Sequence, residues 1–251
     1  LAPSDAEAHY NLGNTLKDLG KIDEAKTSYD QAIALNPNDA LALNNLGITL
    51  QQLGKLDRAE ARYKEAITLR PDYAEAYSNL GNIFNEQARL DEAEAAYGQA
   101  IELKPGYAEA HNNLGVTVQE QGRLDEAVIS FTKAIALNSR YAEAYSNLGH
   151  VLQRSGRLQE AVAKISQAIA LEPEYAAAYL NLGVTLQELG SLLKAKENFK
   201  RAIALNPQLV EAHSNLGVTL QELGKLEEAV ASYLKTIELE SNFLDAYINL
   251  G

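Results

Sequence analysis

Three kinds of residue in this 251-residue chain have types and spacings that could do chemistry. Adjacent carboxylates, which can suggest acid–base work, form four pairs: Asp23 with Glu24, Asp91 with Glu92, Asp125 with Glu126, and Glu227 with Glu228. The histidines, which could ligate a metal, are His9, His111, His150 and His213. An asparagine also recurs at a fixed interval, and its amide can donate hydrogen bonds to a polypeptide backbone and accept them from it.

The carboxylate pairs and the histidines have simpler explanations than catalysis. Each pair stands where a predicted helix begins, and we expect these residues to meet the positive helix terminus and to cap it. Three histidines recur at one position of a repeated pattern that otherwise favours aromatic residues, which predicts helix packing. His150 has no cysteine, second histidine or spaced carboxylates nearby, so we expect a solvent-facing contact residue and no metal. Because no catalytic or phosphate-binding motif occurs either, we expect neither enzyme activity nor a cofactor.

Charge and composition argue against several classes of partner. The net charge of -12 opposes the phosphate backbone of nucleic acids, whose binding depends on arrays of lysine and arginine. No apolar run approaches the roughly 20 residues that cross a bilayer, so no membrane association is expected. The absence of cysteine fits a reducing compartment, and we expect a cytoplasmic location. The sequence begins at Leu1 and stops at Gly251 inside a recurring motif, so we expect a longer parent protein.

A 34-residue repeat organises the sequence. The tripeptide Asn-Leu-Gly recurs every 34 residues without an insertion. It begins at Asn11, Asn45, Asn79, Asn113, Asn147, Asn181, Asn215 and Asn249. With Ala6 as position 1, the complete repeats are residues 6–39, 40–73, 74–107, 108–141, 142–175, 176–209 and 210–243, and residues 244–251 begin an eighth. The chain is therefore predicted to form a single array over residues 1–251.

Each repeat is expected to fold into two helices separated by a tight turn. Small or apolar residues at positions 3, 4, 7, 8 and 11 follow one helical face, and a second stripe runs through positions 17, 20, 24, 27, 28 and 30. Position 15 is usually glycine, which suits a left-handed helix end, and proline at position 32 ends the second helix. Glycine at position 8 disfavours a helix by about 1 kcal/mol relative to alanine. We attribute it to close approach of the two helix axes, beside the alanine of position 20.

These residues resemble the tetratricopeptide repeat. The resemblance covers residues 6–251 and rests on Leu-Gly at positions 7 and 8, alanine at position 20, an aromatic residue at position 24 and proline at position 32. It implies an all-α fold, a right-handed α-solenoid superhelix of tandem antiparallel helix pairs. The departures at Ala88, Ser139, Ile165 and Ser241 do not threaten that fold.

The resemblance places the first helix of each repeat on the inner, concave wall, where it would line a groove. Positions 2, 5, 6, 9, 12 and 13 of that helix, which we call the first-helix stripe, are not used by the predicted core, and position 6 is always asparagine. The predicted peptide-binding residues are Asn11, Asn45, Asn79, Asn113, Asn147, Asn181 and Asn215, with Asn82, Gln119, Gln153, Gln187, Glu86 and Glu120 beside them. The row is similar to the asparagine ladder of O-linked N-acetylglucosamine transferases, which holds substrate chains. Alternatively, each asparagine bonds a neighbouring helix or caps a local backbone group.

The charges on the first-helix stripe indicate the class of ligand. Glutamate is frequent at positions 2 and 13, whereas Lys17 and Arg154 are the only cations on the inner face. Related repeat modules that bind the acidic C-termini of chaperones use a clamp of lysine and arginine, which this stripe lacks. An extended protein or peptide segment that is neutral or basic suits the electrostatics better.

Three functions remain open from the sequence. The first is a protein–protein interaction scaffold that binds an extended segment of a partner in the concave groove. The second, implied by the resemblance, is the substrate-recruiting arm of a glycosyltransferase whose catalytic domain lies outside this chain. The third is a self-assembling structural array, because Leu244, Ala246, Tyr247 and Leu250 have no second helix to cover them. That open end would allow end-to-end association.

Overall fold

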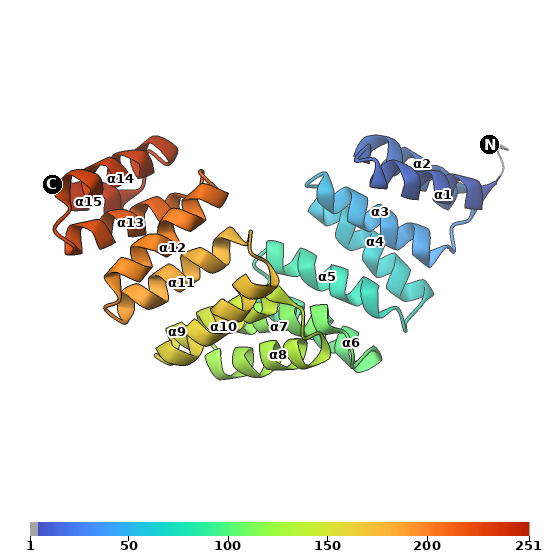
Figure 1. The fold of residues 1–251 in the computed structure, drawn as a ribbon. Coiled ribbons are helices and arrows are strands. Elements are labelled where there is room, and N and C mark those ends of the chain that lie inside the picture. Colours follow the sequence, from blue (N-terminus) through green and yellow to red (C-terminus); the bar gives the residue numbers. More distant parts are fainter. Residues whose placement is uncertain (1–4, 251) are drawn as a thin grey trace. The chain divides into compact units, whose positions relative to one another are not determined.

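The computed structural model describes residues 5–250, and this part of the chain consists of fifteen α-helices without a strand. Residues 1–4 and Gly251, which the predicted array includes, lie outside the described residues, as does the side chain of Leu250. The helices belong to two compact units, Leu1–Gly122 and Arg123–Gly251 (Figure 1). The predicted all-α fold is confirmed.

The helices recur in pairs with constant bounds. The first unit contains α1 (Ala6–Asp18), α2 (Ile22–Leu35), α3 (Ala40–Gln52), α4 (Leu56–Leu69), α5 (Ala74–Glu86), α6 (Leu90–Leu103) and α7 (Ala108–Glu120). The second contains α8 (Leu124–Leu137), α9 (Ala142–Arg154), α10 (Leu158–Leu171), α11 (Ala176–Glu188), α12 (Leu192–Leu205), α13 (Val210–Glu222), α14 (Leu226–Leu239) and α15 (Leu244–Leu250). In every complete repeat the first helix covers positions 1–13 and the second covers positions 17–30, as the apolar spacing predicts.

A left-handed residue ends each first helix in these repeats, as expected for position 15. The backbone φ of Gly20 is 73°, its N–H donates to the carbonyl of Lys17 at 2.9 Å, and the N–H of Lys21 donates to Leu16 at 2.9 Å. This pair of bonds satisfies carbonyls that the helix end would leave free. Ala88 takes the same place in the third repeat with φ of 57°, a conformation that alanine adopts at a cost.

Glycine at position 8 leaves room for the side chain of position 24, which corrects the expected cause. A Cβ on Gly47 would lie 2.5 Å from Cε1 of the buried Tyr63 ring. In the fifth repeat a Cβ on Gly149 would collide with Cγ1 of Ile165 and would lie 3.2 Å from the backbone oxygen of Ala161, at position 20. Close approach of the helix backbones is therefore the lesser reason, because the side chain of position 24 already fills the space.

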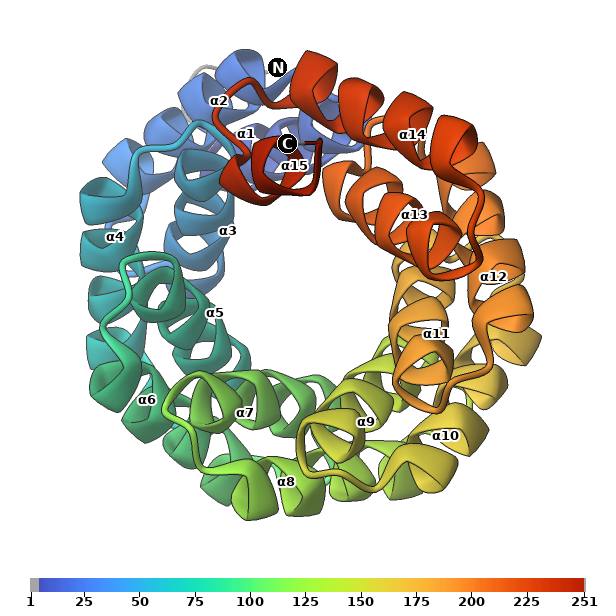
Figure 2. The same ribbon diagram turned by 90° about the vertical axis from the view of Figure 1, so that its left-hand side faces the viewer.

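The first helices lie closer to one another than the second helices do. Within the first unit α1 contacts α3, α3 contacts α5 and α5 contacts α7, and within the second unit α9 contacts α11 and α11 contacts α13. Over the described residues, successive second helices make no such contact. Each unit therefore bends toward its first helices, and Figure 2 shows α3 and α5 inside α4 and α6 in the first unit. The first-helix stripe is the inner face of each unit.

Candidate functional site

The asparagines at position 6, which we call the asparagine row, lie midway along the first helices. The half-buried members are Asn45, Asn79, Asn113, Asn147, Asn181 and Asn215, and the exposed members are Asn11 and Asn249. The row thus reaches the surface of the inner face in both units while its members remain packed against neighbouring side chains. Its availability to a ligand depends on which hydrogen bonds each amide already makes.

Two row asparagines donate to an asparagine at position 9 of the preceding repeat. Nδ2 of Asn45 donates to Oδ1 of Asn14 at 2.9 Å, and Nδ2 of Asn113 donates to Oδ1 of Asn82 at 3.0 Å. Asn45 also donates to the hydroxyl of Tyr10 at 3.2 Å. Asn82, predicted to contact a ligand, is therefore an acceptor within the scaffold.

Where position 9 is another residue type, the acceptor stands at position 5 of the preceding repeat. Nδ2 of Asn79 donates to Oδ1 of Asn44 at 3.0 Å, and Nδ2 of Asn181 donates to Oγ of Ser146 at 3.2 Å. The alternative interpretation of the row, bonding to a neighbouring helix, thus accounts for one donor of these amides. An amide has two N–H donors and a carbonyl acceptor, so Asn79 and Asn181 keep capacity for a ligand.

Asn215 differs from the other half-buried members whose bonds are described above. In the preceding repeat, position 5 is Leu180 and position 9 is Val184. Neither side chain has a polar atom that could accept a hydrogen bond from Asn215. Within residues 5–250 the Asn215 side chain makes no hydrogen bond to another side chain, although its backbone carbonyl accepts from Oγ1 of Thr219 at 2.8 Å. Its entire amide is available to solvent or to a ligand.

Tyrosine hydroxyls at position 24 connect the second helices to the first-helix stripe. The hydroxyls of Tyr29 and Tyr97 donate to Oδ1 of Asn14 and Asn82, each at 2.7 Å. Where position 9 is aliphatic, the hydroxyl instead donates to the glutamine of position 12, as Tyr233 does to Oε1 of Gln221 at 2.9 Å. Burial, followed by the charges of neighbouring groups, raises the pKa of Tyr29 to about 12. These hydroxyls therefore stay protonated over the physiological range.

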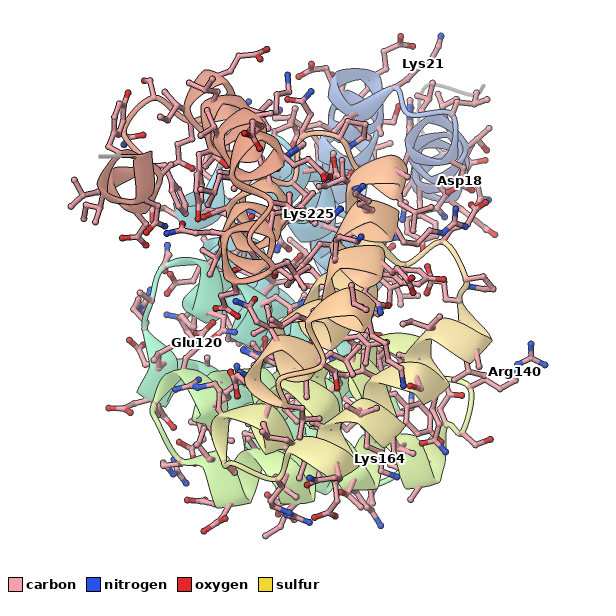
Figure 3. The ribbon with its side chains drawn as sticks, turned by 60° about the vertical axis from the view of Figure 1, so that its left-hand side comes forward. Asp18, Lys21, Glu120, Arg140, Lys164 and Lys225 are labelled. Atoms are coloured by element: carbon pink, nitrogen blue, oxygen red, sulfur yellow. The ribbon has the colours of Figure 1, made fainter. Side chains whose placement is uncertain are left out.

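Glutamine and glutamate of successive repeats also pair along this face. Nε2 of Gln51 donates to Oε1 of Glu86, Nε2 of Gln153 donates to Oε1 of Glu188, and Nε2 of Gln187 donates to Oε1 of Glu222 at 3.4 Å. The structure thus brings Glu86, Gln153 and Gln187 into contacts between repeats. Gln119 is half-buried on α7, and Glu120 is exposed at the end of α7, where Figure 3 labels it.

Sequence reasoning missed the position 24 hydroxyls and the side chains of position 5 as parts of this network. The spacing of the tyrosines matches the apolar stripe and by itself predicts packing alone. One signal is nevertheless visible in the sequence: both repeats with asparagine at position 9, Asn14 and Asn82, have tyrosine at position 24. Tyr63 and Tyr233 also stand at position 24, in repeats with an aliphatic position 9, so the sequence pattern alone does not identify these hydrogen bonds.

The histidines of position 4 pack as expected, and two of them also reach the preceding turn. Nε2 of the buried His213 lies 3.1 Å from the carbonyl oxygen of Pro207, and Nε2 of His111 lies 3.2 Å from that of Pro105. His150 is half-buried rather than solvent-facing. Burial and the nearby Arg154 charge lower its pKa, which favours the neutral imidazole. Over the described residues, no three histidine, cysteine, aspartate or glutamate side chains gather as a metal site.

The carboxylate pairs lie in the first turn of the second helices, as predicted, but they do not cap them. The residue before each second helix is usually lysine or arginine, and its side chain makes no cap bond. It pairs instead with the carboxylate three residues on: Lys21 with Glu24 at 3.4 Å and Lys225 with Glu228 at 3.0 Å. Figure 3 labels Lys21 and Lys225 before α2 and α14. The pairs are exposed surface charges.

No helix among residues 5–250 combines the length and the apolar character needed to cross a membrane. Two family models match the sequence. One, described as the Cilia and flagella-associated protein 70 C-terminal domain, matches residues 39–246, and the other, described as TPR repeat, matches residues 13–54. A search of curated protein sequences finds no match.

Solved structures similar to this chain are arrays of the same repeat. A chain in the crystal structure of the APC/C hetero-tetramer Cut9-Hcn1 has a TM-score of 0.81 and 18% identity, over 98% of this chain and 46% of that one. This chain thus spans less than half the length of that relative. A tetratricopeptide repeat protein from Parabacteroides merdae has a TM-score of 0.76 and 18% identity, over 98% and 97% of the two chains. These two likenesses establish the fold.

A third similar structure has higher sequence identity and a lower TM-score. YrrB, described as a TPR protein with an unusual peptide-binding site, has 27% identity and a TM-score of 0.58. The match covers 73% of this chain and 95% of YrrB.

Proposed function

The chain belongs to the tetratricopeptide repeat family, and from that premise we propose that it holds an extended segment of a partner protein along the asparagine row. The family consists of non-catalytic scaffolds that mediate protein–protein interactions. The similar protein YrrB is described as having a peptide-binding site, which supports a peptide ligand for this chain.

The observation that carries the proposal is the unused hydrogen-bonding capacity of the row. Asn79 and Asn181 each donate one bond to the preceding repeat and keep a second N–H and the side-chain carbonyl. Asn215 keeps its whole amide. An extended polypeptide presents backbone N–H and C=O groups along its length, and amides of this kind bind both without selecting particular side chains.

The charges near the row favour a neutral or basic ligand. Glu86, Glu188 and Glu222 lie at position 13, and Glu188 and Glu222 are exposed at the ends of α11 and α13. Lysine or arginine flanking the bound segment would meet these carboxylates, whereas an acidic segment would be repelled.

The proposal is tested with a phage-displayed library of random 12-residue peptides selected on the whole chain. The affinity of an enriched peptide is then measured for wild type and for a variant with Asn79, Asn113, Asn147 and Asn181 all changed to Ala. We expect affinity to fall at least tenfold, because several hydrogen bonds are lost and each contributes about 0.5 to 1.5 kcal/mol.

The matched control replaces three exposed asparagines that lie off the row, Asn36, Asn38 and Asn242, with Ala, and it should bind as wild type does. The substitutions at Asn79, Asn113 and Asn181 also remove bonds between repeats, so circular dichroism must show that the variant keeps its helices. No enriched peptide, or unchanged affinity in the folded row variant, would overturn the proposal.

A second candidate, end-to-end association of two copies, is favoured by apolar exposure on α14 and α15. Leu226 and Leu234 on α14 are 57% and 55% exposed, and Leu244 and Ile248 on α15 are 68% and 64% exposed. We propose that a second copy would cover these side chains. Sedimentation velocity at high concentration should show a dimer that the Leu226→Glu, Leu234→Glu variant loses, and a wild-type monomer would rule the candidate out.

A further inference from the structure

The side chains that accept hydrogen bonds from the asparagine row stand at positions 9 and 5 of the preceding repeat, and Asn215 is an exception. A row amide donates to position 9 of the preceding repeat where that residue is asparagine, and to a polar residue at position 5 where it is not, while Asn45 donates to both positions. The described bonds that obey the rule have donor–acceptor distances of 2.9 to 3.2 Å. Atoms at these two positions therefore lie in direct contact with the row amide of the next repeat.

At Asn215 both positions are aliphatic. Leu180 and Val184 are half-buried and pack against the apolar cluster that includes Phe199 and Leu216. By the same geometry they stand beside the Asn215 amide, but they cannot bond it. Val218, one turn along the same helix, is also half-buried and packs on this cluster. The surroundings of Asn215 thus combine an unbonded amide with a supported aliphatic surface.

The charged side chains of the first-helix stripe near Asn215 are all negative. In the sixth and seventh repeats the first-helix stripe carries Glu188, Glu211 and Glu222 and neither lysine nor arginine. Glu211 and Glu222 are exposed, and Glu211 lies one turn before Asn215. A ligand that places cations beside an aliphatic residue would complement this surface.

We infer that Asn215, with Leu180, Val184 and Val218, forms a side-chain-selective subsite for an extended peptide segment in which lysine or arginine flanks an aliphatic residue. This inference rests on the proposed peptide-holding function. The aliphatic side chain lies on Leu180, Val184 and Val218, and the Asn215 amide bonds the adjacent peptide backbone. Row asparagines that already donate to the preceding repeat hold the rest of the segment with less selectivity.

The substitution Val184→Asn tests the subsite because it restores the acceptor found in the first and third repeats. Phe199 at position 24 has no hydroxyl to compete for the new oxygen, so Asn215 would donate to it. We expect the affinity of an enriched library peptide to fall about two- to tenfold, as loss of one hydrogen bond implies. Asn215→Ala should lower affinity to a similar extent.

The matched control is Ile48→Asn, which makes the same kind of change at position 9 of the second repeat. Its neighbour Asn79 already donates one N–H to Asn44, so the new acceptor can take only the other N–H, and affinity should fall less than for Val184→Asn. On the peptide side, replacing the aliphatic residue of the enriched peptide by serine should weaken binding to wild type, and this measurement does not depend on how any variant folds.

The outcomes separate the two proposals. Enriched peptides with an aliphatic residue beside lysine or arginine, and weaker binding to Val184→Asn and Asn215→Ala, support the subsite. If peptides are enriched without that pattern, or if both variants bind as wild type does while the four-asparagine variant loses binding, the subsite is wrong and the peptide-holding function stands. If no peptide is enriched, the peptide-holding function fails and the subsite fails with it.

Discussion

The two units share a fold but satisfy the polar groups of their inner faces in different ways. In the first unit the side chains of position 24 are Tyr29, Tyr63 and Tyr97, and every hydroxyl donates to an amide oxygen of the first-helix stripe. In the second unit Phe131, Ile165 and Phe199 precede Tyr233, which alone among them has a hydroxyl. All seven side chains are buried.

The comparison teaches that hydrogen bonds between repeats and hydrogen bonds to a ligand would use the same side-chain amides. Asn45 in the first unit donates to both Tyr10 and Asn14, whereas Asn215 in the second unit has no side-chain partner among residues 5–250. The hydroxyls of position 24 add hydrogen bonds within each repeat of the first unit. Asn215, whose amide has no acceptor in the preceding repeat, lies in the second unit and keeps its capacity for a partner.

The largest difference between the units is expected at alkaline pH. Burial raises the pKa of Tyr29 to about 12, and burial also raises the pKa of Tyr63, Tyr97 and Tyr233. Because the unfolded tyrosines ionise near pH 10, the unfolded state gains stability first, and the free energy of unfolding falls as pH rises from about 10 through the folded pKa values. Among the tyrosines of position 24, three such groups lie in the first unit and one in the second.

Urea unfolding at pH 9 and pH 11 measures this loss. The variant with Tyr29, Tyr63 and Tyr97 changed to Phe should lose much less stability between the two pH values than wild type, and Tyr233→Phe should change the loss only slightly. Equal effects of the two variants would show that the units do not differ in this respect.

Replacing the glycine of position 8 by alanine, which adds a methyl group against the ring of position 24, should have the next largest effect on stability. In Gly47→Ala the new Cβ would lie 2.5 Å from Tyr63, whose hydroxyl is held by Oε1 of Gln51 at 3.2 Å. Overpacking of this kind costs about 1 to 3 kcal/mol. Gly183→Ala meets Phe199 at the same distance but breaks no hydroxyl bond, so it should cost about 1 kcal/mol less. Circular dichroism during urea unfolding compares the two, and an unchanged or raised stability in Gly47→Ala would contradict the account of this glycine.

Two reciprocal substitutions in the turns should each change the free energy of unfolding by about 1 kcal/mol. Ala88 in the first unit has a φ of 57°, and Gly156 in the second has 73°. A left-handed conformation costs roughly 1 to 2 kcal/mol for a residue with a Cβ. Nothing lies within 4 Å of a Cβ built on Gly156, so backbone conformation alone decides the outcome. Ala88→Gly should raise the thermal midpoint and Gly156→Ala should lower it, and shifts of the same sign would contradict this explanation.

The smallest effect is expected from a single hydroxyl. Tyr97→Phe removes the donor to Asn82 at 2.7 Å and should cost about 1 kcal/mol or less. The reciprocal change, Phe199→Tyr, adds a hydroxyl near Gln187, as in repeats where the residue at position 9 is aliphatic. Hydrogen exchange should show faster opening of α5 and α7 in Tyr97→Phe and slower opening of α11 in Phe199→Tyr. No change in either variant would show that these hydroxyls do not hold the inner face together.

Most of the fold could be predicted because each repeat contains its own boundaries. Glycine at position 15, or Ala88 in its place, ends the first helix at position 13, and the apolar spacing sets the second helix over positions 17–30. The cause of glycine at position 8 could not be predicted in the same way. It depends on where the ring of position 24 lies across the helix pair, and spacing along one helix does not give that placement.

The placement of the asparagine row on the inner face could be predicted, but the differences between its members could not. The asparagine row lies on the inner face, yet Asn79 and Asn215 look identical in sequence. They differ because Asn44 precedes the first and Leu180 and Val184 precede the second, and a repeat-by-repeat comparison of positions 5 and 9 is needed to see it. The likeness to the ladder of glycosyltransferases, and the bound peptide itself, stay predictions.

The most direct test of the central claim is NMR of the asparagine side-chain amides in the whole chain labelled with ¹⁵N-asparagine. An enriched library peptide is added, and the NH₂ resonances of Asn215 and Asn45 are compared after assignment by Asn→Ala variants. The account predicts a large shift for Asn215 and little change for Asn45, whose donors are already used. A peptide that binds without shifting the amide of Asn215, or that shifts only Asn45, would contradict it.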